Sequence, residues 1–399
     1  MAVSRRSFLA AVGASSAGAL ALPIASNWRG YEARGAELPL QTPQQGTQEP
    51  KQLENRRADR LLAARPGMVR IDSNENPNGP GERVFKAITA DFHESNRYPV
   101  RSEDDLVAAI CKAHGVQPEN VLLGCGSGEL LRAAVRGFTS PTAGLVAPNP
   151  TFEAPANFAR FIGTPVVAPP VDKQLRLDLD AMVAGARGAG LVYFCNPNNP
   201  TATVHGKSDV SAFVEQMGRV VPEATIQIDE AYHEYVEDPT YATAVPLALS
   251  NPRVFVTRTF SKVFGMAGLR VGYAIGQKGT LAHLAPWLLG SNVNQLALVA
   301  AATAIADQPH IALEQRRNRE TRAYTRAFFE RAGYSVLSCE ANFMMVDIRR
   351  DVKAFKSELL AKGIAVGRAF PPLTTHLRVG IGTMPEMKKA LAVFKTTLA

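Results

Sequence analysis

The sequence is poor in cysteine, and this limits two common kinds of site. Four cysteines occur in 399 residues, Cys111, Cys125, Cys195 and Cys339. They form no short Cys-x-x-Cys pair, and their spacing does not match a set of metal ligands. A disulfide framework is not expected in a domain of this size. We therefore expect four mostly buried thiols and no metal site.

The sequence also lacks a strong excess of one charge. It has 44 Lys and Arg against 36 Asp and Glu, a formal net charge of +8. Without residues 1–30, which hold three arginines and no acidic residue, the balance is 41 against 36, or +5. This excess is mild for the length and does not favour nucleic acid as a partner. The arginines of residues 309–332 alternate with glutamates, which predicts a solvated helix face.

A confident membrane span is the third missing feature. The apolar run at residues 10–24 is short and rich in Ala and Gly, so no stable membrane insertion is expected. It follows residues 4–9, Ser-Arg-Arg-Ser-Phe-Leu, which resemble the twin-arginine export signal. We predict that residues 1–35 are a twin-arginine signal peptide and that the destination is periplasmic or otherwise extracytoplasmic. The alternative is a disordered basic tail.

Short apolar runs alternate with helical stretches from about residue 84 onward. The runs that end in polar loops are 121–123, 144–147, 191–194, 226–228 and 254–256. Strands joined by helical connections predict an α/β fold with a mostly parallel sheet covered on both faces. Ligands bind such sheets beyond the carboxyl ends of the strands. The sequence therefore predicts one shared site at that edge.

The composition predicts several regions along the chain. After the signal peptide we expect a linker or N-terminal arm at 36–66, a segment joining a small domain at 67–97, a large domain at 98–290 and a small α+β domain at 291–399. In the last region, helices are predicted at 309–332 and 352–362, and strands at 336–339, 343–346 and 377–382.

One lysine follows the run 254–256 and is flanked by apolar residues. Loss of hydration disfavours the ammonium form of Lys262 and leaves an amine that can attack a carbonyl. Neighbouring hydroxyl groups and Arg270 are suitable donors to a phosphate. A nucleophilic lysine beside a phosphate site indicates pyridoxal phosphate. A surface lysine at a strand end is the alternative.

Polar residues at three other strand ends could complete such a site. Asp229 ends an apolar run, where a carboxylate needs a partner; a pyridinium N–H would serve, and a helix cap is the alternative. The glycine-rich loop 124–128 opens a helix, whose N–H groups and dipole favour an anion. Arg378 lies between apolar residues and could clamp a substrate α-carboxylate or form a structural salt bridge.

Taken in order, these clusters resemble the histidinol-phosphate aminotransferase family. The motifs that carry the resemblance are residues 74–80, 97–99, 126–129, 196–201, 229–232, 259–262, 268–270 and 377–379. They run from about residue 70 to the C-terminus. The resemblance implies a fold-type I enzyme that depends on pyridoxal 5'-phosphate and has a large and a small domain. It also implies transfer of an amino group between an amino acid and a 2-oxo acid by a ping-pong mechanism.

The resemblance assigns roles around the cofactor. Lys262 matches the lysine that binds the cofactor covalently and shuttles the proton, and Asp229 matches the partner of the ring nitrogen. The residues that match ligands of the phenolic oxygen, the phosphate and the ring face are Asn199, Tyr232, Ser127, Gly128, Thr259, Ser261, Arg270 and Phe152. Tyr98 matches a tyrosine that reaches the phosphate in the neighbouring subunit, which implies a homodimer. A twin-arginine route, which exports folded proteins, would suit an enzyme that captures this cofactor first.

The substrate is less clearly implied. Arg378 matches the α-carboxylate clamp, Arg368 is an approximate counterpart of the arginine that helps hold a substrate phosphate, and Asn76 lies in the first substrate-side motif. Ala202 follows Asn-Pro-Thr where glycine is usual, and export fits poorly with histidine biosynthesis. We expect an amino acid or an amino-acid-like phosphate ester as substrate. The alternatives are decarboxylation of a phosphorylated amino acid, or a non-catalytic ligand-binding protein.

Overall fold

The computed structural model describes residue 61 and residues 64–398, and all of these residues belong to one compact unit. The predicted signal peptide and almost all of the predicted linker lie outside the described residues. The α-helices are α3 (Glu82–Asp91), α4 (Val100–His114), α5 (Ser127–Phe138), α6 (Ala154–Phe161), α7 (Leu179–Ala184), α8 (Lys207–Val220), α9 (Val245–Ser250), α10 (Lys278–Leu284), α11 (Gln295–Ala306), α12 (Gln308–Arg331), α13 (Val352–Ala361) and α14 (Met384–Leu398). Short 3₁₀ turns lie at Phe92–Glu94, Pro118–Asn120, His233–Tyr235 and Ala285–Trp287.

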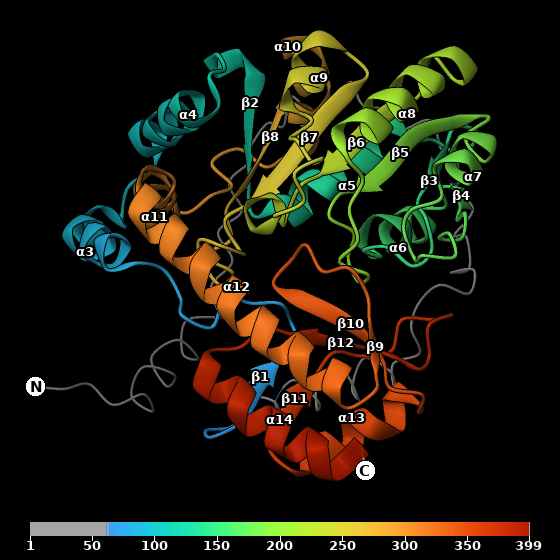
Figure 1. Cartoon of the computed structure of the whole chain (residues 1–399). Helices are drawn as coiled ribbons and strands as arrows, with labels where there is room; N and C mark the ends of the chain where they lie inside the picture. The colour runs from blue at the N-terminus through green and yellow to red at the C-terminus, as the bar shows by residue number, and fades with distance from the viewer. Residues whose placement is uncertain (1–60, 62–63, 399) are drawn as a thin grey trace, which may run out of the picture. The chain divides into compact units, whose positions relative to one another are not determined.

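A seven-stranded sheet forms the centre of the larger part (Figure 1). Its strands, in spatial order, are β2 (Val121–Gly124), β8 (Gly272–Gly276), β7 (Val254–Thr259), β6 (Thr225–Asp229), β5 (Ala189–Cys195), β3 (Gly144–Val146) and β4 (Val166–Val167). Only β8 runs antiparallel to its neighbours. The prediction of a mostly parallel sheet is confirmed, although β4 and β8 were not predicted.

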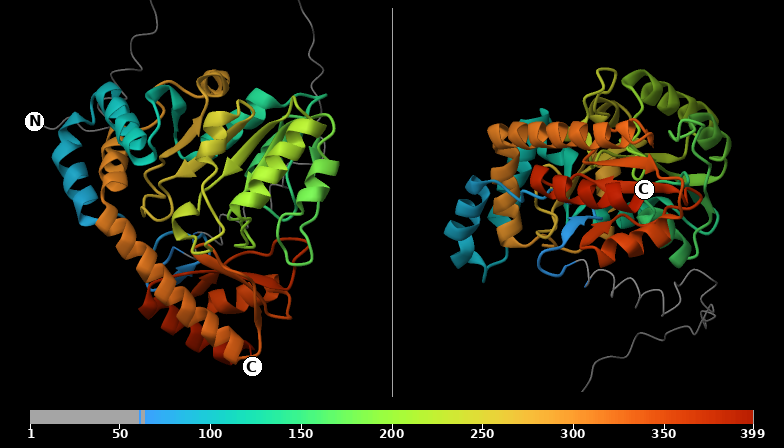
Figure 2. Two further views of the ribbon diagram at one scale, coloured as in Figure 1. Left: turned by 45° about the horizontal axis from the view of Figure 1, so that its top comes forward. Right: turned by 60° about the horizontal axis from the view of Figure 1, so that its bottom comes forward.

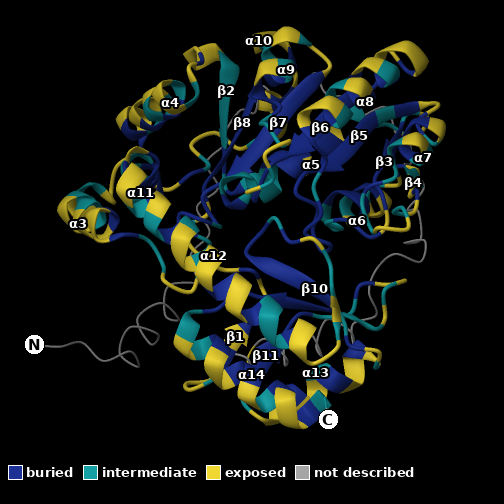
Figure 3. Cartoon of the chain, in the orientation of Figure 1, coloured by how far each residue is buried: buried dark blue, intermediate teal, exposed yellow. Residues whose placement is uncertain are grey.

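Helices cover both faces of this sheet because its strands are apolar on both sides. On β5, Leu191 and Tyr193 join a core that includes residues of α5 and α6, whereas Val192 and Phe194 join a core that includes residues of α8 and α9. Alternate side chains of a strand point to opposite faces, so a continuous apolar run is needed where both faces are buried. The inner strands of the large sheet, β8, β7, β6, β5 and β3, are accordingly almost wholly buried, whereas the edge strands β2 and β4 are only partly buried (Figure 3).

Two smaller sheets lie in the C-terminal part. β12 (His376–Gly380), β10 (Phe343–Asp347) and β9 (Ser335–Val336) form an antiparallel sheet. β1 (Val69–Ile71) pairs in parallel with β11 (Ile364–Val366), so an early segment joins this part. The strand predicted at 336–339 is wrong beyond Val336, and the strand predicted at 377–382 is wrong beyond Gly380, while the strand predicted at 343–346 is confirmed. The domain boundaries stay predictions.

The long helix α12 connects the two parts and runs beside the smaller sheets (Figures 1 and 2). It confirms the helix predicted at 309–332. One side of it is not solvated as predicted, because Glu314 is 2% and Arg322 8% exposed. Arg322 donates to Glu237, which lies just after the Asp229 loop.

Within residues 61 and 64–398, no single helix is long and apolar enough to cross a membrane. Only α11 and α12 taken together have the necessary length and composition, and they are bent by 79° at their junction. The same residues contain no cluster of three His, Cys, Asp or Glu side chains arranged to hold a metal ion.

Strand direction decides where the polar loops meet. β2, β5, β6 and β7 all run the same way, so the residues that follow them gather at one edge of the sheet. β8 runs the other way and begins at Gly272, which brings Arg270 to that edge as well.

Candidate active site

A cavity of about 540 Å³ lies at this edge of the sheet. Its lining includes every predicted site residue except Tyr98 and Asn76, namely Ser127, Gly128, Phe152, Asn199, Asp229, Tyr232, Thr259, Ser261, Lys262, Arg270, Arg368 and Arg378. Further lining residues come from the segment after β1 and from the C-terminal part, among them Asn74, Glu153 and Phe370. The fold therefore brings residues from distant segments into one site.

Lys262 lies inside the cavity with its amine poorly hydrated. Its Nζ donates to the backbone oxygen of Asn74 at 3.1 Å and lies 5.3 Å from the centre of the Tyr232 ring. Burial, and then the positive charge of Arg378, lower the pKa of Lys262 to about 8. A substantial fraction of the amine is therefore neutral near physiological pH and can act as a nucleophile.

Asp229 is buried at the end of β6, and its side-chain donors in the described part of the chain are hydroxyl groups. Its carboxylate accepts from Tyr193 Oη at 2.7 Å and from Thr257 Oγ1 at 3.2 Å. Burial raises the pKa of Asp229 to about 6, although these two hydrogen bonds oppose the shift. A protonated ring nitrogen beside the carboxylate would offset the cost of its burial. Tyr193 and Thr257 were not predicted, although Thr257 is the register neighbour of Asp229 on β7.

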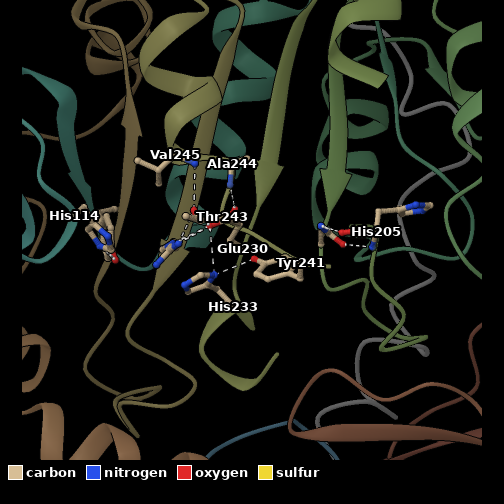
Figure 4. Close-up of polar contacts among 11 residues, drawn as sticks. His114, His205, Glu230, His233, Tyr241, Thr243, Ala244 and Val245 are labelled. Atoms are coloured by element: carbon tan, nitrogen blue, oxygen red, sulfur yellow. Dashed lines mark hydrogen bonds and ion pairs between the residues drawn. The ribbon is translucent and has the colours of Figure 1, made fainter. Parts of the chain in front are cut away.

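The next residue, Glu230, faces a different and fully satisfied environment (Figure 4). Arg258 donates to Glu230 Oε2 from Nε at 3.0 Å and from Nη2 at 2.6 Å. Thr243 Oγ1 and the Ala244 N–H also donate to this carboxylate. Burial opposes the charge, but the Arg258 guanidinium and these donors keep the pKa of Glu230 below its usual value. This pair ties the loop after β6 to β7 and to the start of α9.

Hydroxyl groups, an arginine and a helix start converge at another side of the cavity. α5 begins at Ser127, after Gly126 with φ of +73°. A Cβ on Gly126 would collide with the Arg270 guanidinium, whereas Gly128 faces open space. Arg270 Nη1 also lies 3.4 Å from Ser261 Oγ, which accepts from Thr259. This arrangement of N–H groups at a helix start, hydroxyls and a cation fits a phosphate.

A chain of amides and hydroxyls crosses the cavity floor. Arg378 Nη1 donates to Asn199 Oδ1 at 2.8 Å, and Asn199 Nδ2 donates to Tyr232 Oη at 3.3 Å. Asn74 Nδ2 also lies 3.4 Å from Tyr232 Oη, and its Oδ1 is buried without a hydrogen-bond partner among residues 61 and 64–398. Asn74, which was not among the predicted site residues, therefore faces the site. Asn76 instead donates to the backbone oxygen of Val263 at 2.9 Å and does not line the cavity.

Arg378 is a buried cation without a carboxylate partner among the described residues. It is 9% exposed, and its Nη2 donates to the backbone oxygen of Asp72 at 2.7 Å. Its Nε has no hydrogen-bond partner in the part of the chain that the structure describes. Burial lowers the pKa of Arg378 to about 10. An incoming carboxylate would satisfy both the charge and the unused donor.

The other two predicted residues are placed differently. Arg368 lines the cavity, but it forms an ion pair with Glu153, a residue that was not predicted because nothing in its local pattern marks it. Tyr98 is 86% exposed and lies outside the cavity of its own chain. Its predicted role depends on a second subunit.

The geometry agrees with the comparison to known proteins. Residues 66–394 match the family model of aminotransferase class I and II. The chain belongs to this family. It is 35% identical to the histidinol-phosphate aminotransferase of Symbiobacterium thermophilum over 333 residues, which cover 83% of this chain and 91% of that protein. The enzyme of the same name from Moorella thermoacetica is 34% identical, with coverage of 83% and 86%.

Solved structures agree with this assignment. The structure of histidinol-phosphate aminotransferase from Sinorhizobium meliloti in complex with pyridoxal 5'-phosphate matches with a TM-score of 0.79 and 25% identity, covering 85% of this chain and 94% of that one. The protein is therefore a fold-type I, pyridoxal-phosphate-dependent aminotransferase, a transferase of nitrogenous groups. The decarboxylase and the non-catalytic alternatives are not favoured. Members of the family use amino acid and keto acid substrates and are typically dimers.

The residues of the cavity fit this cofactor. The buried Asp229 carboxylate suits the ring nitrogen, Asn199 and Tyr232 suit the phenolic oxygen, and Lys262 suits the carbonyl carbon. The phosphate fits the group formed by Ser127, Gly128, Thr259, Ser261 and Arg270. Bound there, pyridoxal phosphate supplies a carbonyl that receives the amino group and a ring that withdraws electrons from the substrate α-carbon.

Proposed function

We propose that this aminotransferase takes the amino group of an amino acid, or of an amino-acid-like phosphate ester such as histidinol phosphate, and passes it to a 2-oxo acid. The observation that carries the proposal is the presence of Lys262, Asp229 and Arg378, with its unused donor, in one cavity. A buried arginine of this kind suits a substrate carboxylate. The names of the two similar proteins add histidinol phosphate as a candidate.

Each residue then has a separate task. Arg378 binds and orients the substrate α-carboxylate, or the phosphate that takes its place in histidinol phosphate, and the Asn199 amide holds the guanidinium in place. Lys262, held by the backbone oxygen of Asn74, takes the proton from the substrate α-carbon and returns it at the next stage. Asp229 stays charged opposite the ring nitrogen, so that the ring keeps its proton and its electron-withdrawing character. The buried walls keep water from these groups.

A half-reaction screen tests this proposal. The purified holoenzyme is mixed in turn with each common amino acid and with histidinol phosphate, without any keto acid. We expect at least one of them to remove the absorbance of the cofactor's aldehyde form, and addition of a 2-oxo acid to restore it. Release of carbon dioxide without need of a keto acid, or no spectral change with any compound, would contradict transamination of this substrate class.

We further propose that the active form is a homodimer in which Tyr98 reaches the partner's cofactor phosphate. Its exposure, and that of Phe92 at 65% and Val100 at 66%, supports an apolar contact surface there. Light scattering of the holoenzyme should give twice the mass of the chain. Tyr98→Phe should weaken cofactor binding without lowering that mass, and a monomeric, fully active enzyme would exclude the proposal.

Export by the twin-arginine route is also a proposal. It rests on Arg5 and Arg6 and on the apolar run that follows them. Replacement of both arginines by lysine keeps the charge and should trap the protein in the cytoplasm of a host with this pathway. Fractionation that finds equal amounts of both forms outside the cytoplasm would refute the signal.

A further inference from the structure

The second arginine of the cavity is already paired with a carboxylate of the same chain. Arg368 Nη2 donates to Glu153 Oε2, and its Nη1 donates to the backbone oxygen of Ala369 at 2.8 Å. Both side chains line the cavity and are partly open to solvent, with 38% and 37% of their surface exposed. The Arg368 charge is therefore offset inside the cavity by a carboxylate of the same chain.

The pair lies within reach of a substrate held at Arg378. The guanidinium carbons of Arg368 and Arg378 lie 4.1 and 4.9 Å from the centre of the same ring, Phe370. They are thus no more than 9.0 Å apart, the sum of these two distances. The charges of Glu153 and Arg368 both act on Arg378. An amino acid bound by its α-carboxylate can therefore place the end of a side chain of a few bonds at the pair.

Glu153 is positioned for Arg368 and not for its own helix. It occupies the N-cap of α6, where an acidic side chain commonly accepts from the N–H groups of the first turn. The Glu153 side chain makes no such hydrogen bond. Its carboxylate reaches across to Arg368, which comes from the C-terminal part of the chain, 215 residues later.

We propose that Glu153 determines substrate specificity. By pairing with Arg368 it offsets the charge of that arginine in the substrate cavity, and it directs the enzyme to amino acids with uncharged side chains. A side chain that ends in a phosphate or carboxylate has to displace Glu153 from Arg368 and then remain close to a like charge. An uncharged side chain meets neither cost. This inference rests on the proposed function, because it takes the substrate carboxylate to bind at Arg378.

Glu153→Gln tests the role of the charge while keeping the size of the side chain. We expect the wild-type enzyme to prefer leucine, methionine or phenylalanine to aspartate and glutamate. The variant should raise kcat/KM for the two anionic substrates by about three- to tenfold, mainly through KM, since a partly exposed pair is screened by solvent. The uncharged substrates should change by less than about twofold. Glu215→Gln, which breaks the exposed pair with Arg219, is the control for loss of one charge.

The reciprocal variant separates a charge effect from a change of shape. Arg368→Met leaves Glu153 without this partner. It should therefore lower kcat/KM for the anionic substrates further and raise kcat/KM for ornithine and lysine. In the Arg368→Met background, Glu153→Gln should relieve this repulsion, but kcat/KM for glutamate should stay below that of the Glu153→Gln single variant, which keeps the Arg368 cation. Equal kcat/KM for glutamate in the double variant and in the Glu153→Gln variant would overturn the proposal, because Arg368 would then not act on the substrate.

A binding measurement makes the test independent of turnover. Titration calorimetry of the holoenzyme with maleate and with isovalerate gives the affinities of a dicarboxylate and a monocarboxylate that cannot react. Glu153→Gln should raise the affinity for maleate and leave the affinity for isovalerate unchanged. If this variant has normal cofactor content and the ratio of the two affinities stays as in the wild type, Glu153 does not set specificity. If the wild-type enzyme reacts with no amino acid, the proposed function fails instead, and the calorimetric result still decides the role of Glu153.

Discussion

Two neighbouring carboxylates show how one strand end can serve both the site and the scaffold. Asp229 and Glu230 are 3% and 2% exposed, so burial opposes the charge of both. Glu230 has a buried arginine and a backbone N–H as partners, and its pKa is lowered. Asp229 accepts from the hydroxyl groups of Tyr193 and Thr257, and its pKa is raised to about 6. The pKa values of the two carboxylates therefore differ because of their hydrogen-bond and charge partners, and not because of the depth of their burial.

The same contrast separates two buried arginines. Arg258 is 4% exposed and paired with Glu230, which raises its pKa despite burial. Arg378 is 9% exposed, donates to neutral acceptors, and has a pKa lowered to about 10 by burial. Buried charged side chains that pair with an opposite charge of the same chain stabilise the fold. Buried charged side chains that lack such a partner are suited to bind a charged ligand. The predictions below test this distinction.

Replacement of Lys262 should have the largest effect on turnover. Lys262→Ala removes both the group that binds the cofactor and the group that moves the proton, so we expect turnover to fall by on the order of 10⁴-fold or more. The fold should persist, because the amine's hydrogen bond within the described chain goes to a single backbone oxygen, that of Asn74. Circular dichroism checks the fold, and keto acid production checks turnover. Substantial keto acid from this variant would disprove the assigned role.

Asp229→Asn should have the second largest effect. The amide keeps the shape of the side chain but loses the charge opposite the ring nitrogen. We expect weaker cofactor binding and a fall of about 10²- to 10⁴-fold in exchange of the substrate α-proton with solvent. Equilibrium dialysis and deuterium exchange measure the two effects. Near-normal exchange would show that Asp229 does not act on the ring nitrogen.

Glu230→Gln should instead damage the fold. It leaves Arg258 buried without its counter-charge, which costs about 3–5 kcal/mol of unfolding free energy. Arg378→Met removes the donor to two neutral acceptors, Asn199 Oδ1 and the backbone oxygen of Asp72. It should lower the unfolding free energy by no more than about 2 kcal/mol. Urea denaturation of the cofactor-free proteins compares them directly. Equal losses of stability would remove the distinction between the two arginines.

The raised pKa of Asp229 predicts a dependence of stability on pH. Its pKa in the folded, cofactor-free protein is about 6, above the ordinary value of 3.8, so the folded state binds the proton more tightly. The contribution is complete below about pH 3.8 and is lost as pH rises through about 6, by on the order of 2–3 kcal/mol. Comparison of the wild type with Asp229→Asn by urea denaturation at pH 4 to 7 isolates it. A constant difference across this range would contradict the prediction.

The smallest expected effect is a shift in the pH of cofactor capture. Only the neutral amine of Lys262 reacts, so the rate of cofactor binding to the cofactor-free enzyme should rise through a midpoint near pH 8. Arg378→Met removes a cation that helps lower this pKa and should move the midpoint upward. Stopped-flow absorbance gives the midpoint. An unperturbed lysine would give one near 10.5.

Local sequence determined much of the fold and the chemistry. Apolar runs followed by polar loops predicted five strands of the large sheet, because strands buried on both faces need unbroken apolar runs. Parallel strands end at the same edge of a sheet, so the order of motifs along the chain was enough to predict that Ser127, Asn199, Asp229 and Lys262 share one site. β8 was missed because its glycines, Gly272 and Gly276, weaken a strand pattern.

Only the tertiary structure decided which polar groups find partners. Asn74 and Asn76 stand two residues apart in one motif, yet Asn74 faces the cavity while Asn76 binds a neighbouring loop. Glu153 and Arg368 are 215 residues apart, and no local pattern relates them. Burial and charge partners depend on which distant segments are packed together, and these determine the pKa values and the free donors of the site. The sequence by itself determined the residues available for the chemistry, and the packing decided which of them were left for the cofactor and the substrate.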